Sequence, residues 1–138
     1  LKLEPIKDLL IAGDRNTFKS ILKNTPEICG CALEYEPGYK NHDVFVYRHK
    51  DSIYFKKLSH GSIHFSTERL DKDAHAQRKS YWSNYYYSFS YIKQRVFSRF
   101  EPMYDSKNQF VGYDWYCFNN GRYFYDDRKK GHKRRTEC

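Results

Sequence analysis

Aromatic residues crowd into the last third of this chain. Of its twenty-six aromatic rings, eighteen lie between Tyr81 and Tyr125, where they recur beside Arg and Lys. Runs of aromatic and β-branched residues favour strands, and each ring buries a large area when it packs. We therefore expect this region to form a sheet whose rings supply much of the core. One small interior has no room for all of them, so we also expect some rings to be exposed.

Alternating residues in the first half also indicate strands. They predict a three-strand meander at 31–35, 44–48 and 53–58, followed by a short fourth strand at 62–65. Further strands are expected at 89–97 and 110–118. The alternation is regular enough to predict a sheet with one buried face and one wet face.

A tight turn is indicated near the end of the aromatic region. Asn119-Asn120-Gly121 is a sequence typical of two-residue hairpin turns. It predicts that residues 115–118 pair with residues 123–125 in a β-hairpin.

Helices are expected at the start and in the middle of the chain. Residues 3–24 predict two short helices, because Gly13 can end the first and Asp14 can cap the second. Ser66 or Thr67 can cap a mid-chain helix that extends from Arg69 to Ser80. The fold class predicted is α+β: a short N-terminal helical pair, a largely antiparallel sheet of six to eight strands and one mid-chain helix.

Positive charge is concentrated at the C-terminus. The formal net charge is +8, and residues 128–138 carry six bases against one acid. That segment is therefore +5 and the rest of the chain +3. We expect one domain over residues 1–127 and a flexible basic tail over 128–138, and polyanions are the natural partners of such a tail.

The four cysteines have no spacing typical of a disulfide framework or of a zinc site. Cys29, Cys31, Cys117 and Cys138 are therefore expected to be reduced thiols, and we predict no metal and no cofactor. An intracellular location follows, with nuclear import through the basic tail as one option. No apolar run is long enough to span a bilayer, and the missing initiator Met suggests a domain excised from a longer or secreted protein.

Rings beside cations predict binding to nucleic acid, with RNA or single-stranded DNA preferred. Unpaired bases stack on aromatic rings while phosphates bind positive charge. The stacking residues predicted are Tyr85, Tyr86, Tyr87 and Tyr91. The phosphate-binding residues predicted are Lys93, Arg95, Arg99, Lys129, Lys130, Lys133, Arg134 and Arg135.

Two other functions fit the same sequence. The first is a small metal-independent ribonuclease, an effector or toxin-like enzyme, in which His60 or His64 moves protons while Lys56 or Arg48 stabilises the phosphorane charge. The second is a protein-interaction domain whose aromatic face meets another protein. No phosphate loop, nucleophile elbow or dinucleotide fingerprint points to any other enzyme class.

Overall fold

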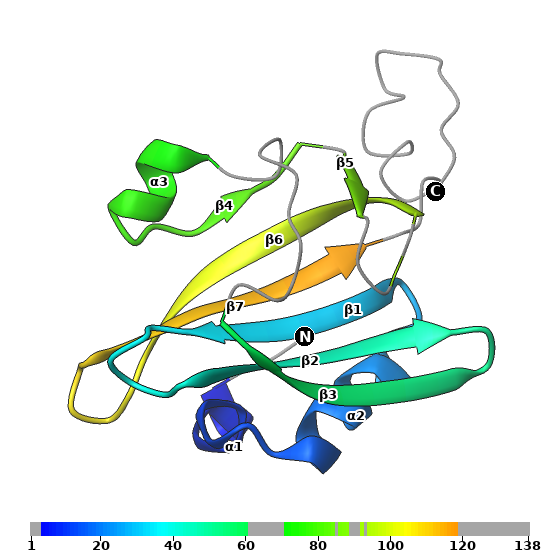
Figure 1. Ribbon diagram of the computed structural model, residues 1–138, viewed down its shortest axis with the longest axis horizontal. Helices are drawn as coiled ribbons and strands as arrows, with labels where there is room; N and C mark the ends of the chain where they lie inside the picture. The colour runs from blue at the N-terminus through cyan, green and yellow to red at the C-terminus, as the bar shows by residue number, and fades with distance from the viewer. Residues whose placement is uncertain (1–3, 61–70, 85, 89–91, 93, 119–138) are drawn as a thin grey trace.

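The computed structural model describes residues 4–60, 71–84, 86–88, 92 and 94–118. Its main element is one seven-stranded sheet in which every pairing is antiparallel. The strands are β1 (Ile28–Tyr35), β2 (His42–His49), β3 (Ser52–Ser59), β4 (Tyr81–Trp82), β5 (Tyr86–Ser88), β6 (Gln94–Tyr104) and β7 (Phe110–Phe118). Figure 1 shows the order β3-β2-β1-β7-β6-β4, with β5 paired to β6. The predicted α+β class and the antiparallel sheet are confirmed.

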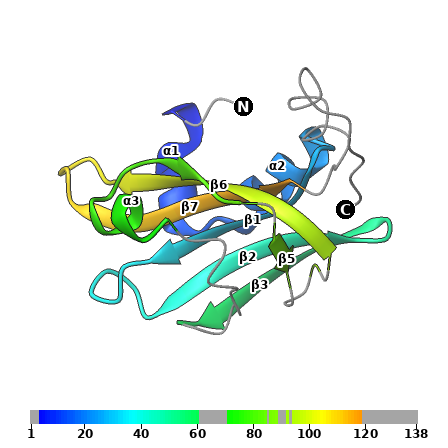
Figure 2. The ribbon, with the colours of Figure 1, turned by 90° about the horizontal axis from the view of Figure 1, so that it is seen from above.

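Three short helical elements precede the sheet in the chain. A 3-10 turn η1 (Glu4–Ile6) leads into α1 (Lys7–Ala12), which is followed by α2 (Arg15–Asn24). Gly13 ends α1 with a φ of 76°, a conformation that favours glycine. The Asp14 carboxylate then caps α2 by accepting a hydrogen bond from the Thr17 backbone N–H at 2.9 Å. Figure 2 shows α1 and α2 together on one side of the sheet.

We call the side of the sheet that carries these helices the helical face. Its core is mostly aliphatic and consists of Leu10, Ile11, Phe18, Ile21 and Leu22 from the helices against Ile28, Cys31, Leu33, Val44, Val46, Val111 and Tyr116 from the strands. Leu10, Phe18 and Leu22 are fully buried. The apolar spacing of α2 therefore fixes which side of the sheet it covers.

The opposite side is rich in rings, and we call it the aromatic face. Its buried members on β1, β2, β6 and β7 are Ala32, Phe45, Tyr47, Val96, Phe100, Tyr113, Trp115 and Cys117. Tyr81 of the edge strand β4 also belongs to it, and the face is covered by Ile92 and by α3 (Lys72–Ala76), whose Ala74 packs on it. Gly30 permits this cover, because a Cβ there would lie 2.7 Å from the Ile92 Cδ1.

The prediction of one wet face is therefore wrong. Most residues of β1, β2 and β7 are buried, and the buried residues include side chains on both faces of the sheet. A sheet covered on both faces has two cores in place of one, so it accommodates many more rings than a half-solvated sheet.

The predicted mid-chain helix is much shorter than expected. It extends only from Lys72 to Ala76, with the Asp71 carboxylate accepting from the Ala74 N–H at 3.1 Å as its cap. Arg78 adopts a positive φ of 57°, which turns the chain away from the helix. Its thin apolar stripe gives a longer helix little to bury.

The predicted hairpin between residues 115–118 and 123–125 is also wrong. Both edges of that part of β7 are already paired, since Cys117 lies opposite Gly30 of β1 and opposite Ser98 of β6. The hairpin partner of β7 is β6, joined to it through residues 105–109. Residues 123–125 and the predicted strand 62–65 lie outside the described residues.

Candidate functional site

The aromatic face has a continuous floor of rings. The ring centroids of Phe45 and Trp115 lie 5.7 Å apart, and those of Trp115 and Phe100 lie 6.1 Å apart. Toward the sheet edge, Tyr47 stacks on Phe45 at 5.5 Å and on Tyr54 at 5.4 Å. Tyr54 is 43% exposed, so the floor reaches solvent along β3.

Helix α3 is attached to one end of this floor through two side chains. The His75 ring stacks on Tyr113 at 4.1 Å, and its Nδ1 lies 2.8 Å from the Tyr81 hydroxyl. The Tyr113 hydroxyl points at three backbone carbonyls of the α3 segment, at 3.4 Å from Ala74, 3.1 Å from His75 and 3.3 Å from Lys79. A few polar contacts therefore hold α3 in place, because none of its own residues is fully buried.

A small pocket of about 190 Å³ lies between α3 and the ends of β1 and β7. Its lining combines charge with aromatic surface: Glu34, Tyr35, Glu36, His75, Arg78, Phe110, Gly112 and Tyr113. The Arg78 guanidinium lies over the Phe110 ring at 4.0 Å and only 3.9 Å from the Glu36 carboxylate. Both charged side chains are about half exposed, so this pair is loose and can rearrange around a bound molecule.

Gly112 lets two strands come together beneath the pocket. A Cβ at this position would lie 2.1 Å from the Glu34 carbonyl oxygen, and the φ of 146° also favours glycine. The close approach brings Glu34 of β1 and Glu36, which follows β1, next to Tyr113 of β7. A glycine inside an otherwise aromatic strand is the sequence signal that could have indicated this site.

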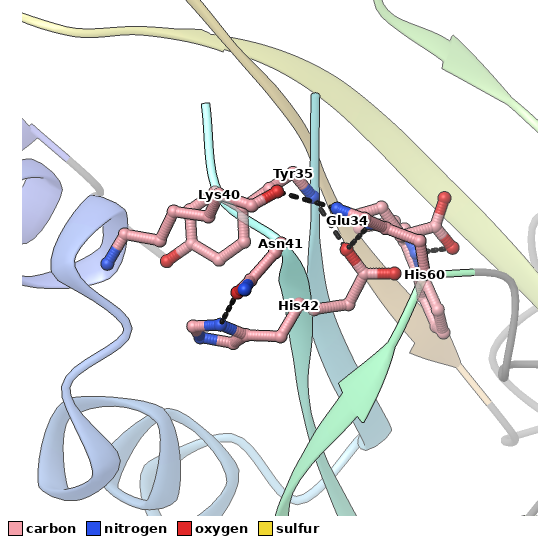
Figure 3. A network of polar contacts seen from close by, with 8 residues as sticks. Glu34, Tyr35, Lys40, Asn41, His42 and His60 are labelled. Atoms are coloured by element: carbon pink, nitrogen blue, oxygen red, sulfur yellow. Dashed lines mark hydrogen bonds and ion pairs between the residues drawn. The ribbon is translucent and has the colours of Figure 1, made fainter. Parts of the chain in front are cut away.

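A polar network continues from the pocket along the ends of β1, β2 and β3 (Figure 3). The Glu34 carboxylate accepts a hydrogen bond from the Trp115 indole N–H at 2.8 Å. The Asp43 carboxylate accepts from the Tyr35 backbone N–H at 2.9 Å, and burial raises the Asp43 pKa above its usual value. The network thus links the aromatic floor to the turn between β1 and β2.

His60, a predicted proton-transfer residue, belongs to this network. Its Nδ1 lies 3.0 Å from the Asp43 carboxylate and its Nε2 lies 2.6 Å from the Lys40 carbonyl oxygen (Figure 3). A carbonyl oxygen only accepts, so Nε2 must carry the hydrogen. Both ring nitrogens therefore bind the protein itself, and His60 holds the β1–β2 turn against the end of β3.

The structure separates the other two described residues of the ribonuclease hypothesis. Arg48 and Ile53 are opposite one another on the helical face, where the Arg48 Nη2 donates to the Leu22 and Ile28 carbonyls at 2.8 and 2.9 Å. Lys56 is opposite Phe45, which lies on the aromatic face. Residues on opposite faces of one sheet cannot act together on one phosphate, and His64 lies outside the described residues.

The structure describes only some of the predicted stacking and phosphate-binding residues. Arg99 is bound within the protein, with its Nε 2.7 Å from the Glu101 carboxylate and its guanidinium over the Trp82 ring at 5.3 Å. Arg95 is exposed on β6, while Tyr86 and Tyr87 form β5 opposite Val96 and Arg95. The others lie outside the described residues: Tyr85, Tyr91, Lys93, Lys129, Lys130, Lys133, Arg134 and Arg135.

A buried carboxyl group lies on the helical face, away from the pocket. Asp114 is fully buried, and its oxygens accept hydrogen bonds from the Tyr116 hydroxyl at 2.5 Å and from the Cys31 thiol at 3.8 Å. Burial raises the pKa of Asp114 to about 7, with the nearby Glu101 charge adding to the effect. The two hydrogen bonds oppose this shift without cancelling it.

Cys29, Cys31 and Cys117 are buried. Cys31 belongs to the helical face, whereas Cys29 and Cys117 belong to the aromatic face. Within the ranges that the structure covers, no group of three metal-ligating side chains comes together.

The chain was compared with known proteins at three levels. No family model matches it, and no curated protein matches it. Solved structures do match. The extracellular domain of soHK1S-Z6, described as a histidine kinase, has a TM-score of 0.59 and 15% identity, over 78% of this chain and 43% of that one.

Two further solved structures give the same result. A protein titled Methyl-accepting Chemotaxis protein X has a TM-score of 0.60 and 13% identity, over 78% of this chain and 45% of that one. The extracellular domain of mmHK1S-Z2, also described as a histidine kinase, has a TM-score of 0.60 and 16% identity, over 94% of this chain and 52% of that one. The chain thus spans about half the length of these structures. At these low identities, the matches show that the folds are similar.

The prediction of nucleic-acid binding is wrong, and so are the related expectations of RNA binding and nuclease activity. The fold is that of domains from histidine kinases and a chemotaxis protein. The physical reason lies in the rings: among those whose burial the structure describes, which excludes Tyr86 and Tyr87, only Tyr54 and Trp82 are exposed. The remainder pack into the two cores or at their margins, and Arg99 is engaged by Glu101.

The expected intracellular or nuclear location has no support from these structures. Two of the three are described as extracellular domains. Among the described residues, no helix combines the length and the apolar character that crossing a bilayer requires.

Proposed function

We propose that this chain is the recognition domain of a sensor protein and that it binds a small polar ligand in the pocket between α3 and the aromatic face. The observation that carries the proposal is the lining of that pocket. Glu36 and Arg78 place one negative and one positive charge in the lining, and both side chains are about half exposed. Phe110 and Tyr113 add an aromatic wall. The fold shared with extracellular domains of histidine kinases supports this reading.

The size of the pocket limits the ligand. Its volume of about 190 Å³ lies below the range of roughly 300–1,000 Å³ typical of drug-sized ligands. The ligand is therefore small, and the mixed charges favour one that carries a cationic group toward Glu36 and an anionic group toward Arg78.

Ligand binding at this site would affect the contacts that hold α3 in position. Arg78 lies two residues beyond the end of α3, and His75 of α3 lines the same pocket. A ligand that separates Arg78 from Glu36 changes two of the few contacts that hold α3 on the sheet. The position of α3 is thus the element through which occupancy can be passed to the rest of a sensor.

A ligand screen by thermal unfolding tests the proposal. The panel consists of small zwitterions, amines and carboxylates at millimolar concentration. A ligand at one hundred times its Kd stabilises the folded state by about 2.7 kcal/mol, which raises Tm by several degrees for a domain of this size. Arg78→Glu should abolish the response, and Lys72→Glu, a change on α3 outside the pocket lining, should keep it. A response that survives Arg78→Glu, or a panel without any response, would overturn the proposal.

The protein-interaction alternative has its own observation. Trp82 is 50% exposed on β4, makes tilted ring contacts with Phe97 and Phe118, and has the Arg99 guanidinium over its ring at 5.3 Å. Exposed Trp beside Arg is typical of residues that dominate protein interfaces. Trp82→Ala should weaken capture of a partner from native extract at least tenfold if this surface is used, while leaving any thermal response to small ligands intact.

A further inference from the structure

A second pocket lies on the helical side of the molecule, between α2 and the hairpin formed by β2 and β3. Its volume is about 610 Å³, within the range of ligand-binding sites. Its lining is polar and cationic: Asn16, Lys19, Ser20, Lys23, Arg48, Asp51 and Ile53. Three cations against one carboxylate give it a net positive charge.

The solvent side of α2 is unusual in its charges. Arg15, Lys19 and Lys23 follow one another at four-residue intervals, and the helix contains no acidic residue. Like charges at this spacing repel and lower helix stability by roughly 0.2–0.5 kcal/mol per pair. Among the described residues, no carboxylate forms an ion pair with Lys19 or Lys23.

Arg48 supplies a fixed guanidinium at the floor of this pocket. Its Nη2 donates to the Leu22 and Ile28 carbonyls, which holds the side chain in one position. Nη1 and Nε make no hydrogen bond to any described residue. Nη1 and Nε can each donate a separate charge-assisted hydrogen bond to an oxyanion, while Nη2 stays bound to the backbone.

We propose that this pocket binds a phosphate group, held by the Arg48 guanidinium with Lys19 and Lys23 on either side. Asn16 and Ser20, one helical turn apart, add neutral donors for the remaining oxygens. The site is independent of the α3 pocket, since the two lie on opposite faces of the sheet and share no lining residue. The phosphate can belong to a free small molecule or to a lipid headgroup.

Titration of the full chain with inorganic phosphate, followed by amide NMR at constant ionic strength, tests the site. We expect saturable shifts confined to α2 and the β2–β3 turn, with Lys19, Lys23 and Asp51 among them. Lys19→Gln/Lys23→Gln should weaken binding at least about tenfold, because charge-assisted hydrogen bonds are among the stronger polar contacts. The control Lys72→Gln/Lys107→Gln removes the same charge from exposed positions on other elements and should leave binding within about twofold.

A parallel arm uses phosphatidylcholine vesicles that contain phosphatidic acid. Vesicle binding that is lost in Lys19→Gln/Lys23→Gln and kept in the control supports a lipid headgroup as the source. Saturable binding of inorganic phosphate without vesicle binding supports a soluble ligand. Shifts that do not saturate, shifts scattered over the surface, or equal weakening in both double variants overturn the proposal. The location of the shifts in the unsubstituted chain decides the matter even if a variant fails to fold.

Discussion

The two faces of the sheet are built from the same strands but held in different ways. The helical face joins aliphatic strand residues to α1 and α2, and three of its helical side chains are fully buried. The aromatic face is held at one end by stacked rings and by hydroxyl contacts to α3, none of whose residues is buried. Packing of the first kind makes one rigid unit, whereas contacts of the second kind can open locally. The difference places the stable part of the fold on one side and the adjustable part, with the proposed ligand pocket, on the other.

The largest effect is expected from a substitution in the helical core. Phe18→Ala removes a fully buried ring on α2 that packs near Phe55. Such a change should lower the free energy of unfolding by about 3–5 kcal/mol, as measured by urea denaturation. Leu9→Ala, on the exposed side of α1, is the control and should change it by less than about 0.5 kcal/mol. Similar values for both would mean that the helices are not integral to the core.

The next effect concerns the pH dependence of stability. The pKa of Asp114 in the folded protein, about 7, lies above the ordinary value of 3.8, so the folded state holds a proton that the unfolded chain releases. The stability that this group contributes is therefore present at low pH and lost as the pH rises through about 7. Asp114→Asn should remove this slope, which is at most about 1.4 kcal/mol per pH unit.

The measurement is the free energy of unfolding at a series of pH values for Asp114→Asn and for Asp73→Asn, an exposed control on α3. The control should keep the slope of the unsubstituted protein. An unchanged slope in Asp114→Asn would show that this carboxyl does not titrate in the folded state.

A matched pair of hydroxyl deletions compares the two faces directly. Tyr35 donates to the Ile11 carbonyl at 2.6 Å on the helical face, and Tyr113 donates to the carbonyls of α3 on the aromatic face. Tyr35→Phe should lower the global free energy of unfolding by about 1 kcal/mol, the usual worth of such a bond. Tyr113→Phe should change it by less, because α3 can detach without unfolding the sheet. If urea denaturation shows the same loss of unfolding free energy in both variants, the two faces do not differ in stability as proposed.

The smallest effect is expected at the Arg99–Glu101 ion pair. Glu101→Gln removes a partly exposed pair, so stability should change by less than about 1 kcal/mol. The Glu101 charge raises the pKa of Asp114, so its loss should also move the pH transition to lower pH. A transition that moves to higher pH would contradict this coupling, and Glu27→Gln on the surface serves as the control.

Local sequence patterns account for much of the secondary structure. The strand predicted at 110–118 is β7 as observed, and the one predicted at 53–58 differs from β3 by one residue at each end. Turn residues and period-two alternation are local signals, so they identify such elements without knowledge of the fold. The end of α3 was missed because Arg78 adopts a positive φ without being glycine.

Pairings between distant segments could not be predicted in the same way. β7 pairs with β1, more than seventy residues earlier, and this pairing excludes the hairpin that Asn119-Asn120-Gly121 predicts. The near-continuous apolar run of β1 was a signal for burial on both faces. Of the candidate site, Gly112 alone had a local signal, since Glu36 and Arg78 meet only through the fold.

Amide hydrogen exchange of the full chain tests the central claim most directly. The amides of α2, such as Phe18, should exchange only with the free energy of global unfolding, since their side chains fill the helical core. The amides of His75, Gln77 and Lys79, which hydrogen-bond within the α3 segment, should exchange through local opening at a free energy several kcal/mol lower. Equal protection of both sets would contradict the account of one rigid and one adjustable face.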